Sequence, residues 1–386
     1  MAAFDMGRVP PVTFGAGRRR DLPGILSGLT GGPARVLLVA DAILAELGPA
    51  HEMAADLKAA GFGVDLAAEI SGEPKEALVD ALCARARTGC SAVIGLGGGA
   101  AMDAAKLVAA AGAAADPCGH YALGRNPFPQ QTLPAIAVPT TAGTGSEVTR
   151  TSIISTEAGF KYWYWAEELM FAHAVLDPEL TLTLPPAITA WTGIDAVAHA
   201  VEAVTARKSN AAGRLYGLEA LRLLTDALPS AVADGTDLEM RGRVQWASMV
   251  AGLALHNCNT HMGHNISHAL GSLAPIHHGL ATGLALEVTL PVLAARPAGA
   301  ETYAMAAQAM GGSDLPEAFS RLMRACAIDR ALPPSCQQVT SRALAEQMKS
   351  SANRGMADNA ACEISDADLD RFAEEVTALD AQEAAA

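Results

Sequence analysis

Six of the ten histidines in this 386-residue chain fall within the segment from Leu255 to Gly279. Imidazole is the side chain most often used to bind transition metals and to move protons near neutral pH. A segment so rich in histidine therefore predicts a metal site, an acid–base site, or both. The rest of the chain would have to supply a carboxylate, a cofactor and a substrate pocket.

Two pairs of potential metal ligands share a spacing of four residues. Asp195 and His199 lie in a segment with helical periodicity, and His264 and His268 repeat the spacing later in the chain. Side chains four apart on a helix point from one face, so each pair aims at a common centre. His278 follows ten residues after His268. One carboxylate and three imidazoles can hold a divalent transition metal with an open coordination position, as a Lewis-acid catalyst requires, and one histidine is left over.

A single aspartate and histidine four apart is more often an exposed helix pair or a hydrogen-bonded core histidine. The second pair and His278 weigh against that interpretation here. Glu202, one turn beyond His199, could orient a metal ligand by a hydrogen bond, although a position on a solvated helix face explains it equally well.

In the first part of the chain, short apolar runs alternate with segments of helical periodicity. Strands are predicted at 36–40, 63–67, 91–96 and 134–138, with helices at 42–60 and 74–88. Such alternation predicts a parallel sheet wrapped by helices. Beyond Leu182 helical segments dominate. We predict an α/β, Rossmann-like, dinucleotide-binding N-terminal domain over residues 1–182, and an all-α metal-binding C-terminal domain over residues 183–386.

Two glycine-containing loops follow these predicted strands. The third strand leads into Gly97, Gly98 and Gly99, where the backbone can turn tightly and approach a phosphate at a helix N-terminus. The fourth leads into the loop 139–149, which carries five hydroxyl residues and two glycines. Together the two loops suit a nucleotide. Taken alone, the glycine turn is more often a plain turn, and the loop 139–149 would be explained equally well as a polar connection.

Composition excludes several classes of partner. The chain has 27 basic and 41 acidic residues, a net charge of −14, which argues against nucleic acid and anionic membrane surfaces. Its apolar run at 107–115 is far shorter than the ~20 residues of a membrane span. Residues 1–11 lack an apolar signal core, and the seven cysteines form no Cys-x-x-Cys pair, so we expect a cytoplasmic protein with free thiols. The acidic and apolar composition also favours a homodimer or larger homo-oligomer.

Taken together, these segments resemble the iron-containing, or group III, alcohol dehydrogenase family. The likeness extends from Asp41 to His278 and lies in the family's order and spacing. It covers the glycine turn with Asp103 and Lys106, the loop 139–149, residues 177–180, residues 193–202, and the segment from His264 to Gly279.

The resemblance implies roles for particular residues. The metal ligands would be Asp195, His199, His264 and His278, which leaves His268 beside the nicotinamide as a catalytic proton relay. The implied cofactor-binding residues are Asp41, Gly97, Gly98, Gly99, Asp103, Thr140, Thr141, Thr144, Ser146, Thr149 and Lys161. A carboxylate at Asp41 would contact the adenosine ribose and repel a 2′-phosphate, which favours NAD over NADP.

Three positions depart from the family pattern. Ala100 stands where serine is usual after the glycines, and Thr151 where asparagine is often found near the substrate. The usual Asn-Pro-Arg near the C-terminus is not evident in residues 359–363. No role is transferred to that last region.

The resemblance implies reversible oxidation of an alcohol to its aldehyde or ketone by hydride transfer to NAD. Fe²⁺ is favoured by the family, and Zn²⁺ shares the same ligands. The polar residues before His264 predict a polar or anionic small-molecule alcohol or aldehyde substrate, or else they satisfy backbone groups and support the metal ligands; they are His256, Asn257, Asn259, Thr260 and His261. Other interpretations are a zinc-dependent polyol dehydrogenase, an NAD-using lyase, and a metal-binding protein without redox turnover.

Overall fold

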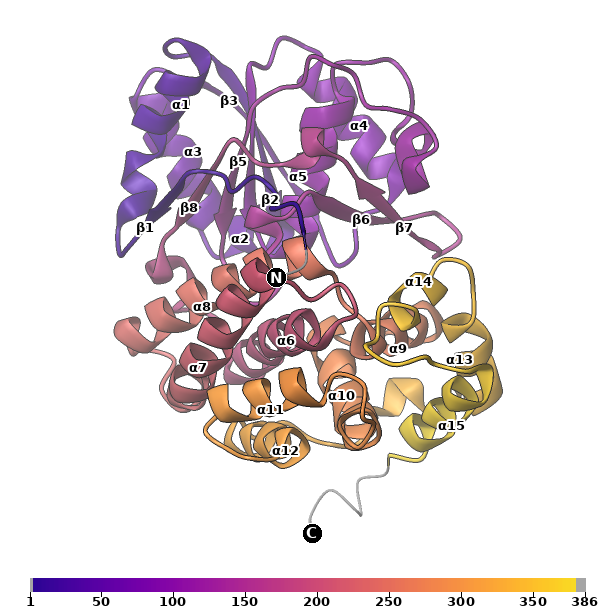
Figure 1. Cartoon of the computed structure of the whole chain (residues 1–386). Helices are drawn as coiled ribbons and strands as arrows, with labels where there is room; N and C mark the ends of the chain where they lie inside the picture. Colours follow the sequence, from indigo (N-terminus) through magenta and orange to yellow (C-terminus); the bar gives the residue numbers. More distant parts are fainter. Residues whose placement is uncertain (1–2, 380–386) are drawn as a thin grey trace. The chain divides into compact units, whose positions relative to one another are not determined.

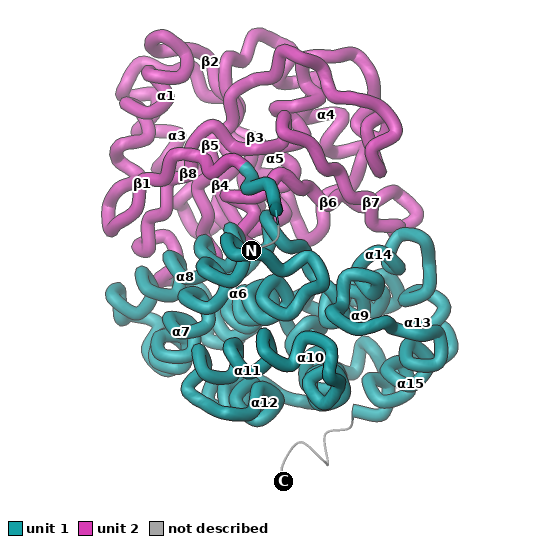
Figure 2. The backbone as a smooth tube through the Cα atoms, in the orientation of Figure 1, with its two compact units in different colours: residues 1–7, 142–144, 183–386 teal, residues 8–141, 145–182 magenta. Residues whose placement is uncertain are grey.

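The computed structural model describes residues 3–379 of the chain. These residues form two compact units (Figure 2). An α/β unit contains residues 8–141 and 145–182, and a helical unit contains the described residues of 1–7, 142–144 and 183–386. Residues 3–7 and 142–144, placed by the sequence analysis in the N-terminal domain, thus pack with the helical unit.

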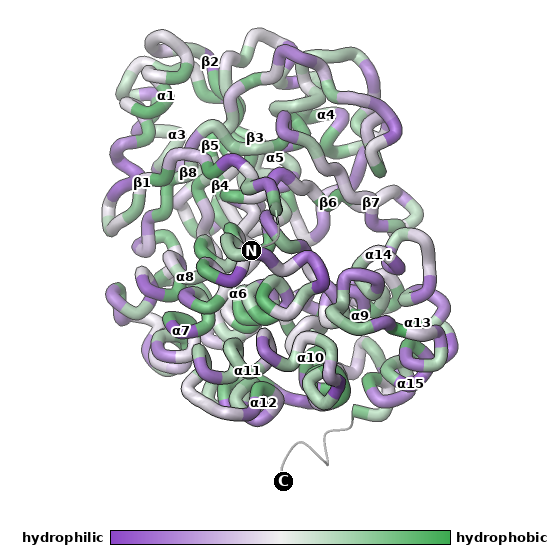
Figure 3. The backbone as a smooth tube through the Cα atoms, viewed as in Figure 1, coloured by the Kyte–Doolittle hydropathy of each residue, from purple (hydrophilic) through white to green (hydrophobic). Residues whose placement is uncertain are grey.

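The α/β unit is built around a parallel sheet, which confirms the predicted fold class (Figure 1). In the described part of the chain it has six strands, in the spatial order β1 (Val12–Phe14), β8 (His173–Leu176), β5 (Ala135–Pro139), β4 (Ala92–Gly97), β2 (Arg35–Asp41) and β3 (Gly63–Ile70). β4 and β5 are buried and apolar along their whole length, and β2 from Val36 to Ala40, because both faces of the sheet are covered by helices. Green segments in Figure 3 follow these strands.

Helices cover the two faces of this sheet. One face packs against α1 (Leu22–Thr30), α2 (Ala42–Glu46) and α3 (Pro49–Ala59) in a single buried apolar cluster. The other carries α5 (Gly99–Ala111), with α4 (Glu76–Ala86) beside it. Gly95 on β4 allows α5 to approach closely, since a Cβ there would lie 2.8 Å from the Cβ of Ala105.

The predicted helix over 42–60 is wrong as a single element. It is divided between α2 and α3 at Gly48, whose φ of 107° is outside the helical region, and Pro49 then begins the next helix. The sequence analysis also missed β1, β8 and the antiparallel hairpin of β6 (Thr151–Ser155) and β7 (Lys161–Trp165). The first two strands are only three and four residues long, too short for a periodic pattern.

The helical unit contains the helical segments that were expected after Leu182. Their bounds are α6 (Pro186–Thr205), α7 (Ala211–Ala233), α8 (Leu238–Cys258), α9 (Met262–Leu273), α10 (His278–Ala294), α11 (Ala300–Ala309), α12 (Leu315–Ala325), α13 (Ser341–Met348), α14 (Arg354–Ala357) and α15 (Asp366–Thr377). Helix α6 is the core of this unit, because it is buried almost continuously from Thr189 to Thr205. It packs against α7, α8 and α10.

Among the described residues, no helix combines the length and the apolar character needed to cross a membrane.

Candidate functional site

The helical unit gathers a buried carboxylate and two imidazoles. Asp195 and His199 lie one turn apart on α6, and His264 comes from α9. Their potential ligand atoms all lie within 4.8 Å of one another, and the three side chains are 3–5% exposed. The spacing of four therefore does place Asp195 and His199 toward one centre.

His278, the first residue of α10, lies beside this group. Its Nε2 is 3.7 Å from Oδ1 of Asp195, and its ring centroid is 5.3 Å from that of His264. The backbone explains the approach: a Cβ on Gly279 would lie 2.0 Å from the carbonyl oxygen of Trp191, so only glycine at position 279 lets the start of α10 come this close to α6. The structure thus brings together the four predicted metal ligands.

The donor set fits a divalent cation. Oδ1 of Asp195 and Nε2 of His264 are buried and have no hydrogen-bond partner among the described residues. Leaving such groups unpaired costs about 1–3 kcal/mol each, and more when a charge is involved. Burial, with the nearby ring of His199, lowers the pKa of His264 to about 3, so its imidazole is neutral. Neutral imidazole and a carboxylate are the forms that bind Fe²⁺ or Zn²⁺.

The far side of each buried histidine ring is held by a hydrogen bond. Nδ1 of His199 is 3.2 Å from the carbonyl oxygen of Gly143, and Nδ1 of His264 is 2.5 Å from Oε2 of Glu202. Both Nδ1 atoms are donors, because carbonyl and carboxylate oxygens only accept. In the neutral form of either ring, Nε2 then keeps the lone pair that a metal requires. Glu202 is fully buried, which rules out the solvated helix face that the sequence left open.

The sequence analysis missed Gly143 as the partner of His199, a predicted metal ligand. The loop that contains it was assigned to the nucleotide, and residues 142–144 instead pack with the helical unit. A Cβ on Gly143 would lie 2.6 Å from the carbonyl oxygen of Thr192, so only glycine allows this approach to α6. A contact across 56 positions leaves no local pattern by which the sequence could have revealed it. Thr144, a predicted cofactor residue, belongs to the same three-residue segment.

His268 lies one turn after His264 and is half-buried. Its ring centroid is 5.3 Å from that of His278 and 6.3 Å from that of His264. The predicted proton relay is therefore next to the ligand group.

In the α/β unit, the glycine turn and Asp41 come together. β4 ends at Gly97, which adopts φ +148°, and α5 begins at Gly99. The N–H of Gly98 donates to Oδ2 of Asp41 over 2.7 Å. Burial raises the pKa of Asp41, and this hydrogen bond partly opposes the shift. The loop residue Thr140 donates its N–H to the carbonyl of Gly97. Thr141 also adjoins the turn, because a Cβ on Gly98 would lie 3.5 Å from its hydroxyl oxygen.

Three further predicted cofactor residues, Asp103, Ser146 and Lys161, are tied to this unit by internal contacts. Asp103 accepts from Oγ of Ser146 over 2.6 Å and from the N–H of Ile153 over 2.8 Å. These bonds join α5 to the loop 139–149 and to the hairpin. Lys161, at the start of β7, forms an ion pair with Glu73.

Lys106 is a buried anchor that the sequence analysis quoted but gave no role. Its Nζ donates to the hydroxyl of Thr149 over 3.2 Å and to the carbonyl of Thr151 over 2.8 Å. Burial lowers the pKa of Lys106 to about 8 and raises that of its neighbour Glu147 to about 7. The hydrogen bond from Lys106 holds the hydroxyl of Thr149, a predicted cofactor residue, in place.

The polar residues before His264 mostly satisfy other protein groups. Asn257 accepts from the N–H of Gly7 over 3.1 Å, and Nε2 of His261 lies 2.9 Å from the hydroxyl oxygen of Thr205. The carbonyl of Thr260 accepts from the side chain of Asn359. Of these, the side chain of Asn257 satisfies a backbone group, as the second interpretation of the sequence expected.

A parallel α/β sheet, and a helical unit that gathers a carboxylate and imidazoles, are what the sequence analysis expected of a metal-dependent dehydrogenase. Residues 10–178 match the family described as iron-containing alcohol dehydrogenase, and residues 189–368 match the C-terminal part of the Fe-containing alcohol dehydrogenase family. The chain belongs to the iron-containing alcohol dehydrogenase family, as its motifs indicated.

Several relatives are similar over most of their length. The NAD-dependent methanol dehydrogenase of Bacillus methanolicus is 31% identical over 78% of this chain and 77% of its own. The sulfoacetaldehyde reductase of Bilophila wadsworthia is 31% identical over 85% of this chain and 84% of its own. A solved structure of the sulfoacetaldehyde reductase from Bifidobacterium kashiwanohense in complex with NAD⁺ has a TM-score of 0.87 at 28% identity, covering 98% of this chain and 100% of that one.

Proposed function

We propose that this protein interconverts a small polar alcohol and its aldehyde or ketone by hydride transfer with NAD(H), at a divalent iron ion. The observation that carries the proposal is the buried pair formed by Oδ1 of Asp195 and Nε2 of His264, which no described protein group satisfies. A divalent cation between them would remove the cost of burying both. His199 and His278 complete the proposed ligand set.

A bound divalent cation supplies a Lewis acid for the substrate hydroxyl, and NAD supplies the hydride acceptor. The protein's part is to hold the substrate oxygen in one position and to provide a path for its proton. His268 is suited to the second task, because it is half-buried and its ring is 5.3 Å from that of His278. In this proposal it accepts the hydroxyl proton and passes it to solvent.

The proposed division of labour follows the two predicted domains. Residues 1–182 bind NAD, with the pyrophosphate at the glycine turn and the N-terminus of α5. The carboxylate of Asp41, at the end of β2, disfavours the 2′-phosphate of NADP. Residues 183–386 hold the metal.

The proposal also covers the substrate class, the cellular location and the oligomeric state of the enzyme. The two sulfoacetaldehyde reductases among the relatives support a polar or anionic substrate. The seven cysteines, all free thiols in the structure, support a cytoplasmic enzyme. We further propose a homodimer, which light scattering of the purified protein would test.

The test is anaerobic reconstitution with Fe(II) or Zn(II), followed by NAD reduction across simple alcohols, polyols and hydroxy acids. Metal-dependent NADH formation in the wild-type protein, lost in His278→Ala, is the expected result. The best substrate decides whether a polar group is required.

Other outcomes would separate the alternatives. Turnover with zinc and polyols alone would identify a polyol dehydrogenase. Bound metal and NAD with no alcohol oxidised would favour a lyase, and bound metal without NAD affinity would leave a metal-binding protein.

A further inference from the structure

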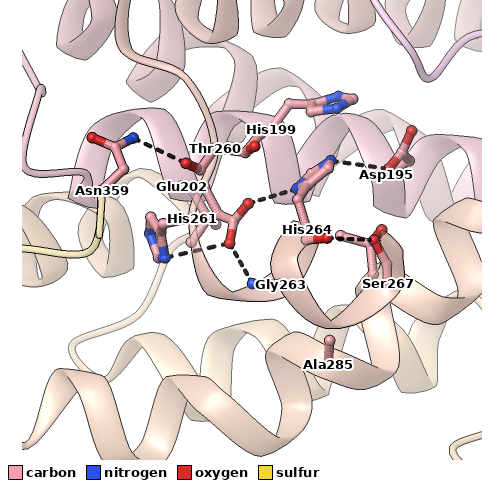
Figure 4. Close-up of polar contacts among 12 residues, drawn as sticks. Asp195, His199, Glu202, Thr260, His261, Gly263, His264, Ser267, Ala285 and Asn359 are labelled. Atoms are coloured by element: carbon pink, nitrogen blue, oxygen red, sulfur yellow. Dashed lines mark hydrogen bonds and ion pairs between the residues drawn. The ribbon is translucent and has the colours of Figure 1, made fainter. Parts of the chain in front are cut away.

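Glu202 is a fully buried carboxylate on α6 that the proposed reaction does not use directly. A carboxylate removed from water must be paired or neutralised, so its partners show what it does. Figure 4 shows the carboxylate of Glu202 directed at the segment 261–264, where α9 begins.

Both oxygens of Glu202 are occupied by that segment. Oε2 accepts from Nδ1 of His264, and Oε1 accepts from the N–H of Gly263, each over 2.5 Å. Nδ1 of His261 lies 3.3 Å from Oε1 on the other side. The first turn of α9 is therefore held to α6 through a single side chain.

The backbone at Gly263 is adapted to this contact. A Cβ on Gly263 would lie 3.1 Å from Oε1 of Glu202 and 2.9 Å from a methyl carbon of Leu286. A larger residue would have to move away from the carboxylate or from α10. The absence of a side chain thus keeps the N–H within reach.

The contact selects one tautomer of His264. A carboxylate can only accept, so Nδ1 carries the hydrogen and Nε2 presents its lone pair toward Asp195, whose Oδ1 is 3.7 Å away. His199 is held by a neutral carbonyl instead. A charged acceptor makes the stronger hydrogen bond and increases the electron density on the ring that it holds.

We propose that Glu202 is the positioning residue of the metal centre, which fixes the orientation and the tautomer of His264. The inference rests on the proposed function, because it takes His264 as a metal ligand. Outer carboxylates of this kind typically change metal affinity by about 10–100-fold.

Glu202→Gln is the decisive variant because it keeps the shape of the side chain. The amide has one accepting oxygen where the carboxylate has two, so it cannot satisfy both the ring of His264 and the N–H of Gly263. If its NH₂ group faces the ring, the hydrogen of His264 moves to Nε2 and the lone pair is lost for the metal.

Glu287→Gln is the matched control. Glu287 lies on α10, its side chain is 4% exposed, and it pairs with Arg330 and accepts from Ser320. It is also a buried carboxylate of the helical unit, but its partners are not metal ligands.

The experiment measures the dissociation constant for Co(II) by competition with a chromophoric chelator, together with the visible spectrum of the Co(II) protein. We expect Glu202→Gln to weaken binding by about 10–100-fold and to alter the spectrum, whereas Glu287→Gln keeps both. Equal dissociation constants and spectra in wild type and Glu202→Gln would overturn the inference. So would equal weakening in the two variants, which would indicate a general loss of stability.

A wild-type protein that does not bind Co(II) would refute the proposed metal centre, and the inference with it. If Glu202→Gln does not fold, ring-nitrogen NMR of the zinc-loaded wild-type protein with ¹⁵N-labelled histidine decides the question. A proton on Nδ1 of His264, strongly shifted downfield, is expected. A proton on Nε2 would contradict the proposal.

Discussion

The imidazole rings of His199 and His264 lie nearly parallel, with centroids 4.6 Å apart and an angle of 26° between their planes. They come from α6 and α9, and each is held at Nδ1 by an acceptor on its far side. The potential ligand atoms of the two rings and of Asp195 lie within 4.8 Å of one another. Protein hydrogen bonds therefore hold two of the four predicted metal ligands in position.

His268 and His278 are expected to differ in the effect of substitution. His278→Ala should lower bound metal per chain, because Nε2 of His278 lies 3.7 Å from Oδ1 of Asp195. His268→Ala should keep the metal and slow turnover by about 10²–10⁴-fold, the usual range for a lost acid–base group. Elemental analysis of bound metal and measurement of kcat, both made on the two variants, check this prediction. Identical metal loss in both variants would refute the division of roles.

Gly143→Ala should destabilise the protein and weaken metal binding. The new methyl group would lie 2.6 Å from the carbonyl oxygen of Thr192, and relief of that clash moves the acceptor away from His199. We expect a loss of about 1–3 kcal/mol in the free energy of unfolding, as for other overpacked sites. The control is Gly28→Ala on α1, where nothing lies within 4 Å and a small gain in stability is expected. The measurement is urea unfolding of both variants. An equal change in the free energy of unfolding in the two variants would contradict the prediction.

Glu147 predicts a pH dependence of stability. Its folded pKa of about 7 exceeds the usual 4.5, so between these pH values the native state binds more protons than the unfolded state. Its contribution to stability is therefore present below pH 4.5 and lost as the pH rises through 7. Relative to Glu147→Gln, wild type should lose on the order of 3 kcal/mol between pH 4.5 and 8, since one pKa unit is worth about 1.4 kcal/mol.

Denaturant unfolding of both proteins across this range is the measurement. Parallel curves would show that Glu147 does not titrate there. Glu219→Gln is a useful control, because a hydrogen bond from Arg222 lowers the pKa of Glu219 and its contribution changes only at lower pH.

Asp41→Asn should relax the choice between NAD and NADP. The amide oxygen can still accept from the N–H of Gly98, while the negative charge that repels a 2′-phosphate is removed. The ratio of kcat/KM values for NAD and NADP should fall by at least about tenfold, or about 1.4 kcal/mol. Asp56→Asn, an exposed position on α3, makes the same change in charge and should leave the ratio unaltered. An unchanged ratio in Asp41→Asn would place cofactor selection elsewhere.

Whether a contact in this protein can be predicted from the sequence depends on how far apart its two residues lie in the chain. Asp195 and His199 could be paired from sequence because helical periodicity is a local property. The acceptor of His199 could not be foreseen, since Gly143 is 56 positions away and its approach depends on tertiary packing. Glu202 was left undecided because its burial is a property of the folded unit.

The same limit applies in the α/β unit. The apolar strands and the glycine turn were predicted from composition, whereas the anchoring of Thr149 by Lys106 depends on how α5 meets the hairpin. The polar residues Asn257 and His261 were compatible with a substrate pocket until their partners were known.

The three-residue segment 142–144 has a consequence for how such a protein can be divided or recombined. A gene fragment encoding only residues 183–386 would contain Asp195, His199, His264 and His278, but it would lack the carbonyl of Gly143 that holds one of these rings. Residues 183–386 are therefore not an independent genetic module. A chimera made by joining two relatives at residue 182 would take the acceptor for His199 from one parent and all four predicted metal ligands from the other.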